Sequence, residues 1–126
     1  MRKSNMATYL SQLTSAWQNA IKQVNKLSSA GSQSTTIKTT ADKLFLLSEV
    51  EIFGSTSYSV SGEGTQYAYY KAGNSKVKNV SGSASNWWER SPCANYTTGF
   101  CSVGSSGSAR TSNASASRGV AFGFCV

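Results

Sequence analysis

The sequence predicts one α+β domain, with helices in the N-terminal half and a small, mostly antiparallel sheet in the C-terminal half. Three observations lead to this prediction. Apolar residues recur at helical spacing from Asn5 onward, β-branched and apolar runs follow, and the last third alternates bulky with small residues. At 126 residues the chain has room for a modest core and one binding face.

The N-terminal pattern predicts a helical face that packs on the core. Ser15 and Gln18 have the spacing of a capping box, so one long helix and two short helices meeting near residue 14 both fit. The apolar face comprises Met6, Tyr9, Leu10, Leu13, Ala16, Trp17, Ile21 and Val24.

The middle of the chain predicts short elements in sequence. Residues 35–40 are β-branched and indicate an extended strand, and residues 44–47 indicate a buried strand. Ser48 and Glu51 form a second capping-box spacing, which predicts a helical turn over residues 49–53 that ends at Gly54. Glu49 and Glu51 are therefore interpreted as cap and dipole partners and not as an acid and base pair.

A Ser- and Gly-rich loop over residues 55–64 leads to a tyrosine cluster. Tyr67, Tyr69 and Tyr70 followed by Gly73 predict a short helix with a glycine stop. These rings could form a binding platform or pack half-buried under the loop, and both readings stay open here.

The last third predicts a frame around a permissive segment. Trp87 and Trp88 are adjacent, so a strand would place them on opposite faces. Residues 100–103 and 108–111 flank glycines and serines and indicate a hairpin with a four-residue turn. Val120, Phe122, Phe124 and Val126 are expected to face the core from a final strand whose small face lies against a close neighbour.

Composition excludes several classes of function. Histidine is absent, which removes Ser/His/Asp and Cys/His nucleophiles, and five scattered acids leave no calcium loop. We expect no catalytic residues, no metal site and no cofactor, hence no enzyme. Net charge is +7, but the basic residues fall singly, so nucleic acid is not expected as a partner.

The start of the chain shows no signal peptide, and no segment is apolar enough for membrane insertion. We expect a protein made in the cytoplasm. Cys93, Cys101 and Cys125 are an odd set confined to the last third, which favours reduced thiols.

The run WWERSP, the hairpin FCSVGSSGSA, the ending SRGVAFGFCV and the stretch DKLFLLSEVEIFG together resemble a C-type-lectin-like domain of unknown function from gut bacteria and their phages. The resemblance covers roughly residues 6–126 and implies a C-type-lectin-like fold over a single domain, residues 1–126. Relatives carry an N-terminal β segment that pairs with the last strand, and it is missing here. Either the domain is trimmed or naturally shortened, or another chain covers the edge of residues 119–126, and we expect a homo-oligomer or association with another chain along the last strand.

The ending is also similar to formylglycine-generating enzymes and to the variable proteins of diversity-generating retroelements. The oxidase needs closely spaced copper-binding cysteines, whereas Cys93 and Cys101 are separated by a loop and part of a strand. In the retroelement system, adenines are mutated mostly in AAC or AAT template codons, and such codons cannot come to encode Lys, Glu, Gln, Met or Trp. Residues 93–118 contain none of these five types, which favours the variable protein.

These resemblances imply a non-enzymatic binding domain on a phage particle or a bacterial surface, whose partner is a protein or glycan on a target surface. A structural or assembly domain and a cysteine-dependent oxidase are the alternatives. The expected ligand-binding residues, which could also be plain solvated loop, are Asn95, Tyr96, Thr97, Ser102, Arg110, Thr111, Asn113 and Ser115. The expected structural anchors are Trp87, Trp88, Arg90, Pro92, Phe122 and Phe124.

Overall fold

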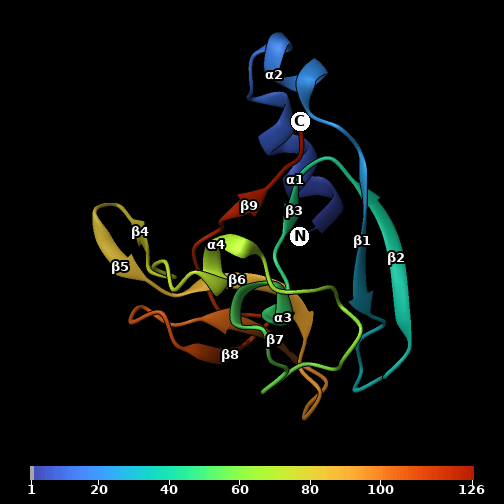
Figure 1. Ribbon diagram of the computed structural model, residues 1–126, viewed down its shortest axis with the longest axis vertical. Helices are drawn as coiled ribbons and strands as arrows, with labels where there is room; N and C mark the ends of the chain where they lie inside the picture. The colour runs from blue at the N-terminus through green and yellow to red at the C-terminus, as the bar shows by residue number, and fades with distance from the viewer. Residues whose placement is uncertain (1) are drawn as a thin grey trace.

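The computed structural model describes residues 2–126 and has an α+β architecture with four short helices and four small antiparallel sheets in that range (Figure 1). Two helices and the end of the chain lie at one pole, and the largest sheet lies at the other. The elements are α1 (Arg2–Ser11), α2 (Ser15–Ala20), β1 (Val24–Ser29), β2 (Ile37–Asp42), β3 (Phe45–Leu46), α3 (Glu49–Phe53), α4 (Ala68–Lys71), β4 (Lys78–Val80), β5 (Ser83–Ser85), β6 (Trp87–Pro92), β7 (Gly99–Val103), β8 (Ala109–Asn113) and β9 (Phe122–Gly123).

The N-terminal apolar face forms two helices, α1 and α2, which meet near residue 14 as one of the two readings predicted. The predicted capping box at Ser15 is wrong, because Thr14 is the N-cap and makes no side-chain cap bond. Gln18 instead donates to the Leu13 carbonyl at 2.7 Å. Trp17 is 49% exposed, so the predicted core face is only partly buried.

Strand β1 was not predicted, because Val24 was assigned to the end of the helical face. β1 pairs antiparallel with β2 from Val24 opposite Asp42 to Ser29 opposite Ile37. The predicted strand over residues 35–40 therefore exists, displaced by two residues. The pair forms a long ribbon along one side of the molecule (Figure 1).

The middle of the chain confirms the local signals. Ser48 Oγ accepts a bond from the Glu51 backbone N–H at 3.3 Å, and Glu51 Oε2 accepts from the Ser48 N–H at 3.0 Å. Both halves of the predicted capping box are therefore present, and α3 ends at Gly54 with φ of 72°. The short helix α4 is also as predicted, with Gly73 just beyond it.

Strands β6, β7 and β8 form the three-stranded sheet, and β7 and β8 are the predicted hairpin. Trp87 lies in a buried cluster with Ile52, Tyr70 and Val103. Trp88 is also buried, but it lies edge-on to Phe100, as expected for neighbours on opposite faces of a strand. The β4 and β5 hairpin precedes this sheet and was not predicted.

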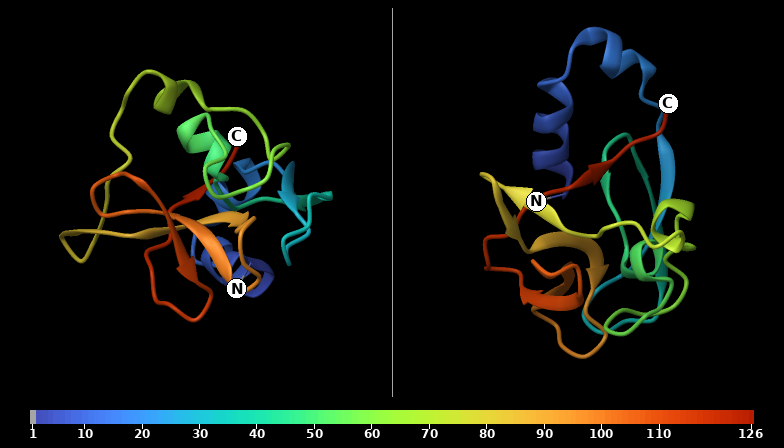
Figure 2. Two further views of the ribbon diagram at one scale, coloured as in Figure 1. Left: turned by 90° about the horizontal axis from the view of Figure 1, so that it is seen from below. Right: turned by 60° about the vertical axis from the view of Figure 1, so that its left-hand side comes forward.

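The final segment differs from the prediction. β9 has two residues and pairs with β3, and Phe122, Phe124 and Val126 are 37%, 41% and 67% exposed. The expectation that this bulky face enters the core is wrong for these three residues, whereas Val120 packs against the buried cluster of Met6, Ile21 and Leu44. Phe122 stacks on Tyr9, and Phe124 meets Trp17 edge-on. The segment runs back to the helical pole, where Cys125 pairs with Lys22 (Figure 2).

The small residues of this final segment do lie against a close neighbour, as predicted. A Cβ built on Gly123 would come within 2.9 Å of the Phe45 ring. Glycine at this position therefore allows β9 to approach β3.

Candidate ligand-binding site

A buried ion cluster joins β1, α3 and β6. Arg90 donates from Nη1 to Glu51 Oε2 at 2.5 Å and from Nη2 to Glu51 Oε1 at 3.0 Å. Its remaining donors bind the carbonyls of Leu27, Leu46 and Glu63 at 2.7 to 2.9 Å. Because a guanidinium has five N–H groups, Arg90 has no donor left for a ligand.

Lys26 completes this cluster. Its Nζ donates to Glu51 Oε1 at 2.5 Å and to the Tyr67 hydroxyl at 2.9 Å. Burial opposes ionisation of Glu51, but the bonds from Arg90, Lys26 and the Ser48 backbone prevail and lower its pKa. Glu51 is therefore a structural anion shared by two cations.

Two further glutamates hold the loop of residues 55–64. Glu49 accepts bonds from the backbone N–H groups of Tyr58 and Ser59 and from Ser59 Oγ at 2.6 Å. Glu63 accepts from the Ser29 N–H at 2.7 Å and from Ser91 Oγ. Burial raises the pKa of Glu63 above its usual value. The expectation that Glu49 caps a helix misses this role, because its carboxylate orders the loop.

Glu89 differs from the other three glutamates. Its side chain is 2% exposed, and neither carboxyl oxygen has a hydrogen-bond partner within the described structure. Burial and the nearby Glu49 and Glu63 raise the pKa of Glu89 to about 9, against a weaker opposing effect of Arg90. Glu89 is therefore a neutral carboxylic acid at neutral pH, with one donor and free acceptor capacity.

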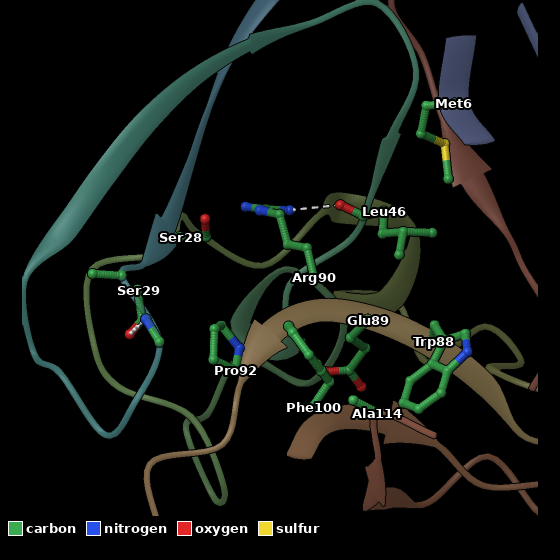
Figure 3. Close-up of a pocket in the computed structure, with 12 residues that line it drawn as sticks. Met6, Ser28, Ser29, Leu46, Trp88, Glu89, Arg90, Pro92, Phe100 and Ala114 are labelled. Carbon is green, nitrogen blue, oxygen red and sulfur yellow. Dashed lines mark hydrogen bonds between the residues drawn. The ribbon is translucent and has the colours of Figure 1, made fainter. Parts of the chain in front are cut away.

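Glu89 lines a cavity of about 570 Å³ between α1, β1, β3, β6 and β7 (Figure 3). Its wall is mostly apolar. Figure 3 shows Glu89 on β6 together with its neighbours Trp88 and Arg90. The apolar side chains of the wall are Met6, Leu46, Trp88, Pro92, Phe100 and Ala114.

The predicted binding residues divide into three groups. Asn95, Thr97, Arg110, Asn113 and Ser115 are exposed, as expected. Tyr96 and Thr111 are half-buried and hydrogen-bonded to each other. Ser102 is fully buried and bonded to Ser112 Oγ, so its predicted display is wrong.

The predicted binding residues also do not share one face. Arg110 and Thr111 are consecutive on β8, so their side chains leave the sheet on opposite sides. Asn113 and Ser115 are different, because they flank Ala114 in the cavity wall. These two residues lie next to the cavity that the sequence did not reveal.

The six predicted anchors differ in burial. Trp87, Trp88 and Arg90 are buried and Pro92 is half-buried. Phe122 and Phe124 are exposed and do not anchor the core.

Cys93 and Cys101 are neighbours in space although they are separated in sequence. The Cys93 thiol bonds to Cys101 and Tyr96, and burial raises the pKa of both thiols. Copper binds cysteine as the thiolate, and burial disfavours the thiolate form of both residues. The pair therefore does not fit the copper centre that the oxidase needs. Within the described residues, no group of three or more His, Cys, Asp or Glu side chains is placed to hold a metal ion.

The chain matches the family model described as a domain of unknown function, DUF6273, over residues 3–126. It belongs to that family. Comparison of this DUF6273 domain with curated proteins and with solved structures gave no match. None of the helices described for the domain is long and apolar enough to cross a membrane.

Sequence reasoning missed Glu89, although one signal was available. The run WWERSP places an acid and a base in a strand beside two tryptophans, and charged residues there are buried with them. The run predicts Arg90 as an anchor but gives no sign that the acid next to it is buried without a hydrogen-bond partner.

Proposed function

We propose that this domain is a non-enzymatic binding module whose ligand occupies the cavity at Glu89. One observation carries the proposal: a mostly apolar cavity of about 570 Å³ lies between α1, β1, β3, β6 and β7, and the buried, unpaired Glu89 is among the residues that line it. Small-molecule sites are typically concave, largely apolar and supplied with a few polar groups, in volumes of about 300–1,000 Å³. A native protein rarely leaves a buried polar group unpaired without a reason.

The test fills the cavity. Ala114→Trp places a large ring in its wall, and Ser115→Trp adds the same ring at the exposed neighbouring residue. We expect the neutral fluorophore N-phenylnaphthylamine to bind the wild-type protein and the Ser115→Trp control in a one-to-one complex. Ala114→Trp should abolish the fluorescence increase without changing the unfolding midpoint. Equal binding by the two variants, or no binding to the wild type, would overturn the proposal.

A second candidate function is display of the polar loop and hairpin to a protein or glycan on a target surface. The exposure of Asn95, Thr97, Asn113 and Ser115 supports it, because Asn and Ser provide adaptable hydrogen bonds in binding loops. Substituting all four by alanine should remove adhesion to target cells and leave stability unchanged. Unchanged adhesion would favour the structural or assembly alternative.

The C-type-lectin-like fold, the retroelement variable protein and the location on a phage or bacterial surface belong to this second candidate. Residues 93–118 support it by lacking Lys, Glu, Gln, Met and Trp. The neighbouring DNA tests it. A reverse transcriptase gene and a near-repeat of the codons for residues 87–126 that differs at adenines are expected, and their absence would remove the diversification.

A further inference from the structure

We propose that a second pocket, which contains Arg118, binds an acidic sugar: the acid group binds the guanidinium and the sugar hydroxyls bind the neighbouring polar side chains. The pocket has a volume of about 450 Å³ and lies between the β4 and β5 hairpin, the turn after β7 and the segment before β9. It shares no lining residue with the cavity of the proposed function, so the two proposals are independent. The polar residues of this Arg118 pocket are Ser85, Asn86, Ser105, Ser117 and Arg118.

Backbone contacts hold the frame of the Arg118 pocket. The Gly119 N–H donates to the Asn86 carbonyl at 2.8 Å, and the Gly119 carbonyl accepts from the Trp88 N–H at 2.9 Å. A Cβ at position 119 would come within 2.9 Å of Val80 Cγ2, so glycine lets this segment approach the hairpin. The hairpin itself extends from one side of the molecule (Figure 1). The pocket is therefore formed between segments that hydrogen bonds keep in place.

Arg118 is oriented by the protein and keeps donors for a ligand. Its Nε donates to Ser112 Oγ at 3.0 Å, and its Nη1 donates to the Ser117 carbonyl at 3.1 Å. A guanidinium has five N–H groups, so three of them have no partner in the described part of the chain. The residue is exposed, which leaves these groups within reach of a ligand. Two such donors can bind a carboxylate or a phosphate side by side.

The charges around the pocket favour an anion. Arg118 is the charged residue of the lining, and none of the five acidic residues of the chain belongs to it. Lys78 is opposite Ser85 in the β4 and β5 pair. Opposite side chains of an antiparallel pair share a face, so Lys78 adds positive charge next to the pocket. A cationic ligand would meet two like charges here.

The other polar groups are suited to sugar hydroxyls. Asn86 Oδ1 accepts from the Ser105 N–H at 2.8 Å, which fixes the orientation of the amide. Both hydrogens on Asn86 Nδ2 remain without a partner among the residues that the structure describes. Ser105 and Ser117 are exposed, and each hydroxyl can donate and accept. The pocket thus combines one charged donor group with several neutral ones.

The lining argues against other anions. It contains no aromatic side chain, so the base of a nucleotide would have no ring on which to stack. A simple ion such as acetate would bind Arg118 and leave the amide and the hydroxyls unused. An acidic sugar uses both kinds of group, and Val80 and Ala84 provide apolar contact for the C–H groups of its ring.

NMR titration of the isotopically labelled full chain tests the inference at neutral pH and low salt. Three ligands share one sugar ring: glucuronate carries a carboxylate, glucose 6-phosphate carries a phosphate, and glucose carries neither. We expect the acidic sugars to shift the amide signals of Asn86, Ser105 and Gly119. They should bind about tenfold more tightly than glucose, because hydrogen bonds to a charged group are stronger than neutral ones. The tighter of the two identifies the acid group.

Acetate supplies the carboxylate without the ring, and it should bind more weakly than glucuronate. Added sodium chloride should weaken the binding of both acidic sugars more than that of glucose, because salt screens exposed charges.

Two variants remove different parts of the site. Arg118→Gln removes the cation, and Arg110→Gln is its matched control, because Arg110 is also exposed but does not line the pocket. Asn86→Asp keeps the side-chain shape and the acceptor for the Ser105 N–H, but it replaces the free amide donors with a negative charge. We expect Arg118→Gln and Asn86→Asp to lose the preference for acidic sugars over glucose and Arg110→Gln to keep it. Unfolding midpoints verify that the variants fold, and if one does not, the wild-type preference among the ligands decides the inference.

The outcomes also separate this pocket from the cavity. Equal affinity for glucuronate and glucose, equal affinity for glucuronate and acetate, signal shifts only at residues outside the Arg118 pocket, or unchanged binding by Arg118→Gln would each overturn the inference. N-phenylnaphthylamine should bind Arg118→Gln as it binds the wild type, because the two sites share no lining residue. Loss of one binding activity with the other intact therefore shows which proposal fails.

Discussion

Arg90 and Glu51 are 39 residues apart in sequence and form a buried two-bond ion pair, with Nη1 to Oε2 at 2.5 Å and Nη2 to Oε1 at 3.0 Å. The pair ties β6 to the first turn of α3, where Glu51 also closes the capping box. Strand β6 also provides Trp88 and Glu89 to the cavity wall, so the ion pair fixes the strand that carries the site.

Arg90→Met should lower the free energy of unfolding by about 3–5 kcal/mol, because it removes one partner of a buried pair and leaves Glu51 with Lys26 alone. Urea denaturation measures this change. Arg110→Met is the control, because Arg110 is exposed on β8, and it should change stability by no more than about 0.5 kcal/mol. A similar small loss in both variants would contradict the assigned role of Arg90.

Glu89→Gln should stabilise the protein increasingly as pH rises. The native carboxyl holds its proton up to about pH 9, whereas the unfolded chain loses it near the ordinary pKa of 4.5. Between these values the unfolded state binds fewer protons, so wild-type stability falls with pH by up to about 1.4 kcal/mol per unit from this group. Urea midpoints of the two proteins at several pH values measure the difference, and a constant difference would refute the shift.

Glu51→Gln should have the opposite pH profile. The pKa of Glu51 is lowered in the folded protein, so its contribution is present above pH 4.5 and is lost as pH falls through the folded pKa. The variant should be much less stable than wild type at neutral pH and closer to it in acid. A gap that is as large in acid as at neutral pH would count against the ion pair.

Cys125 should be the one thiol that reacts rapidly in the native protein. Cys125 is exposed, whereas Cys93 and Cys101 are buried and burial raises their pKa values. Iodoacetamide labelling followed by peptide mass spectrometry should show Cys125 alone modified in buffer and all three modified in denaturant. Rapid native labelling of Cys101 would disprove this placement.

Gly99→Ala should displace Tyr96 and destabilise the protein by about 1–3 kcal/mol. A Cβ at Gly99 would lie 2.1 to 2.3 Å from atoms of the Tyr96 ring and hydroxyl, and Tyr96 bonds to Thr111. In a Tyr96→Ala background the same glycine change should cost much less. Additive costs in a double-mutant cycle would show that the two residues do not interact.

The chain should form oligomers through its last segment. Trp17, Phe124 and Val126 leave apolar surface at one pole, and exposed apolar surface favours association. Light scattering at micromolar concentration should show a species larger than the monomer, and Phe124→Ser should reduce it. A monomer at that concentration would contradict the prediction.

Much of the fold could be predicted where the signal is local. The capping box at Ser48, the helix end at Gly54 and the β7 and β8 hairpin depend on residues a few positions apart. The same holds for the opposite facing of Trp87 and Trp88. Each is set by backbone geometry that neighbouring residues determine.

The remainder depends on contacts across the chain. β1 could not be separated from the preceding helical face, because Val24 continues its spacing and its β partner lies eighteen residues further on, at Asp42. Bulky and small residues alternate in the final segment as they would in a core strand. β3 pairs only with Phe122 and Gly123, however, and the aromatic rings of the segment stay outside the core. Glu89 was missed because no local pattern shows that three other glutamates lie nearby and that Arg90 is already occupied.

Because the four glutamates are buried, most acidic side chains of this protein lie inside it and most basic side chains lie at its surface. Of the acids, only Asp42 remains outside, together with eight lysines and arginines whose exposure is described. Unfolding would expose four carboxyl groups, of which Glu89 ionises only then, and only two cations, so the unfolded chain presents a weaker positive field than the folded one. The native protein should therefore elute from a cation exchanger at higher salt than the same protein in urea, which would make chromatographic retention a measure of its folding.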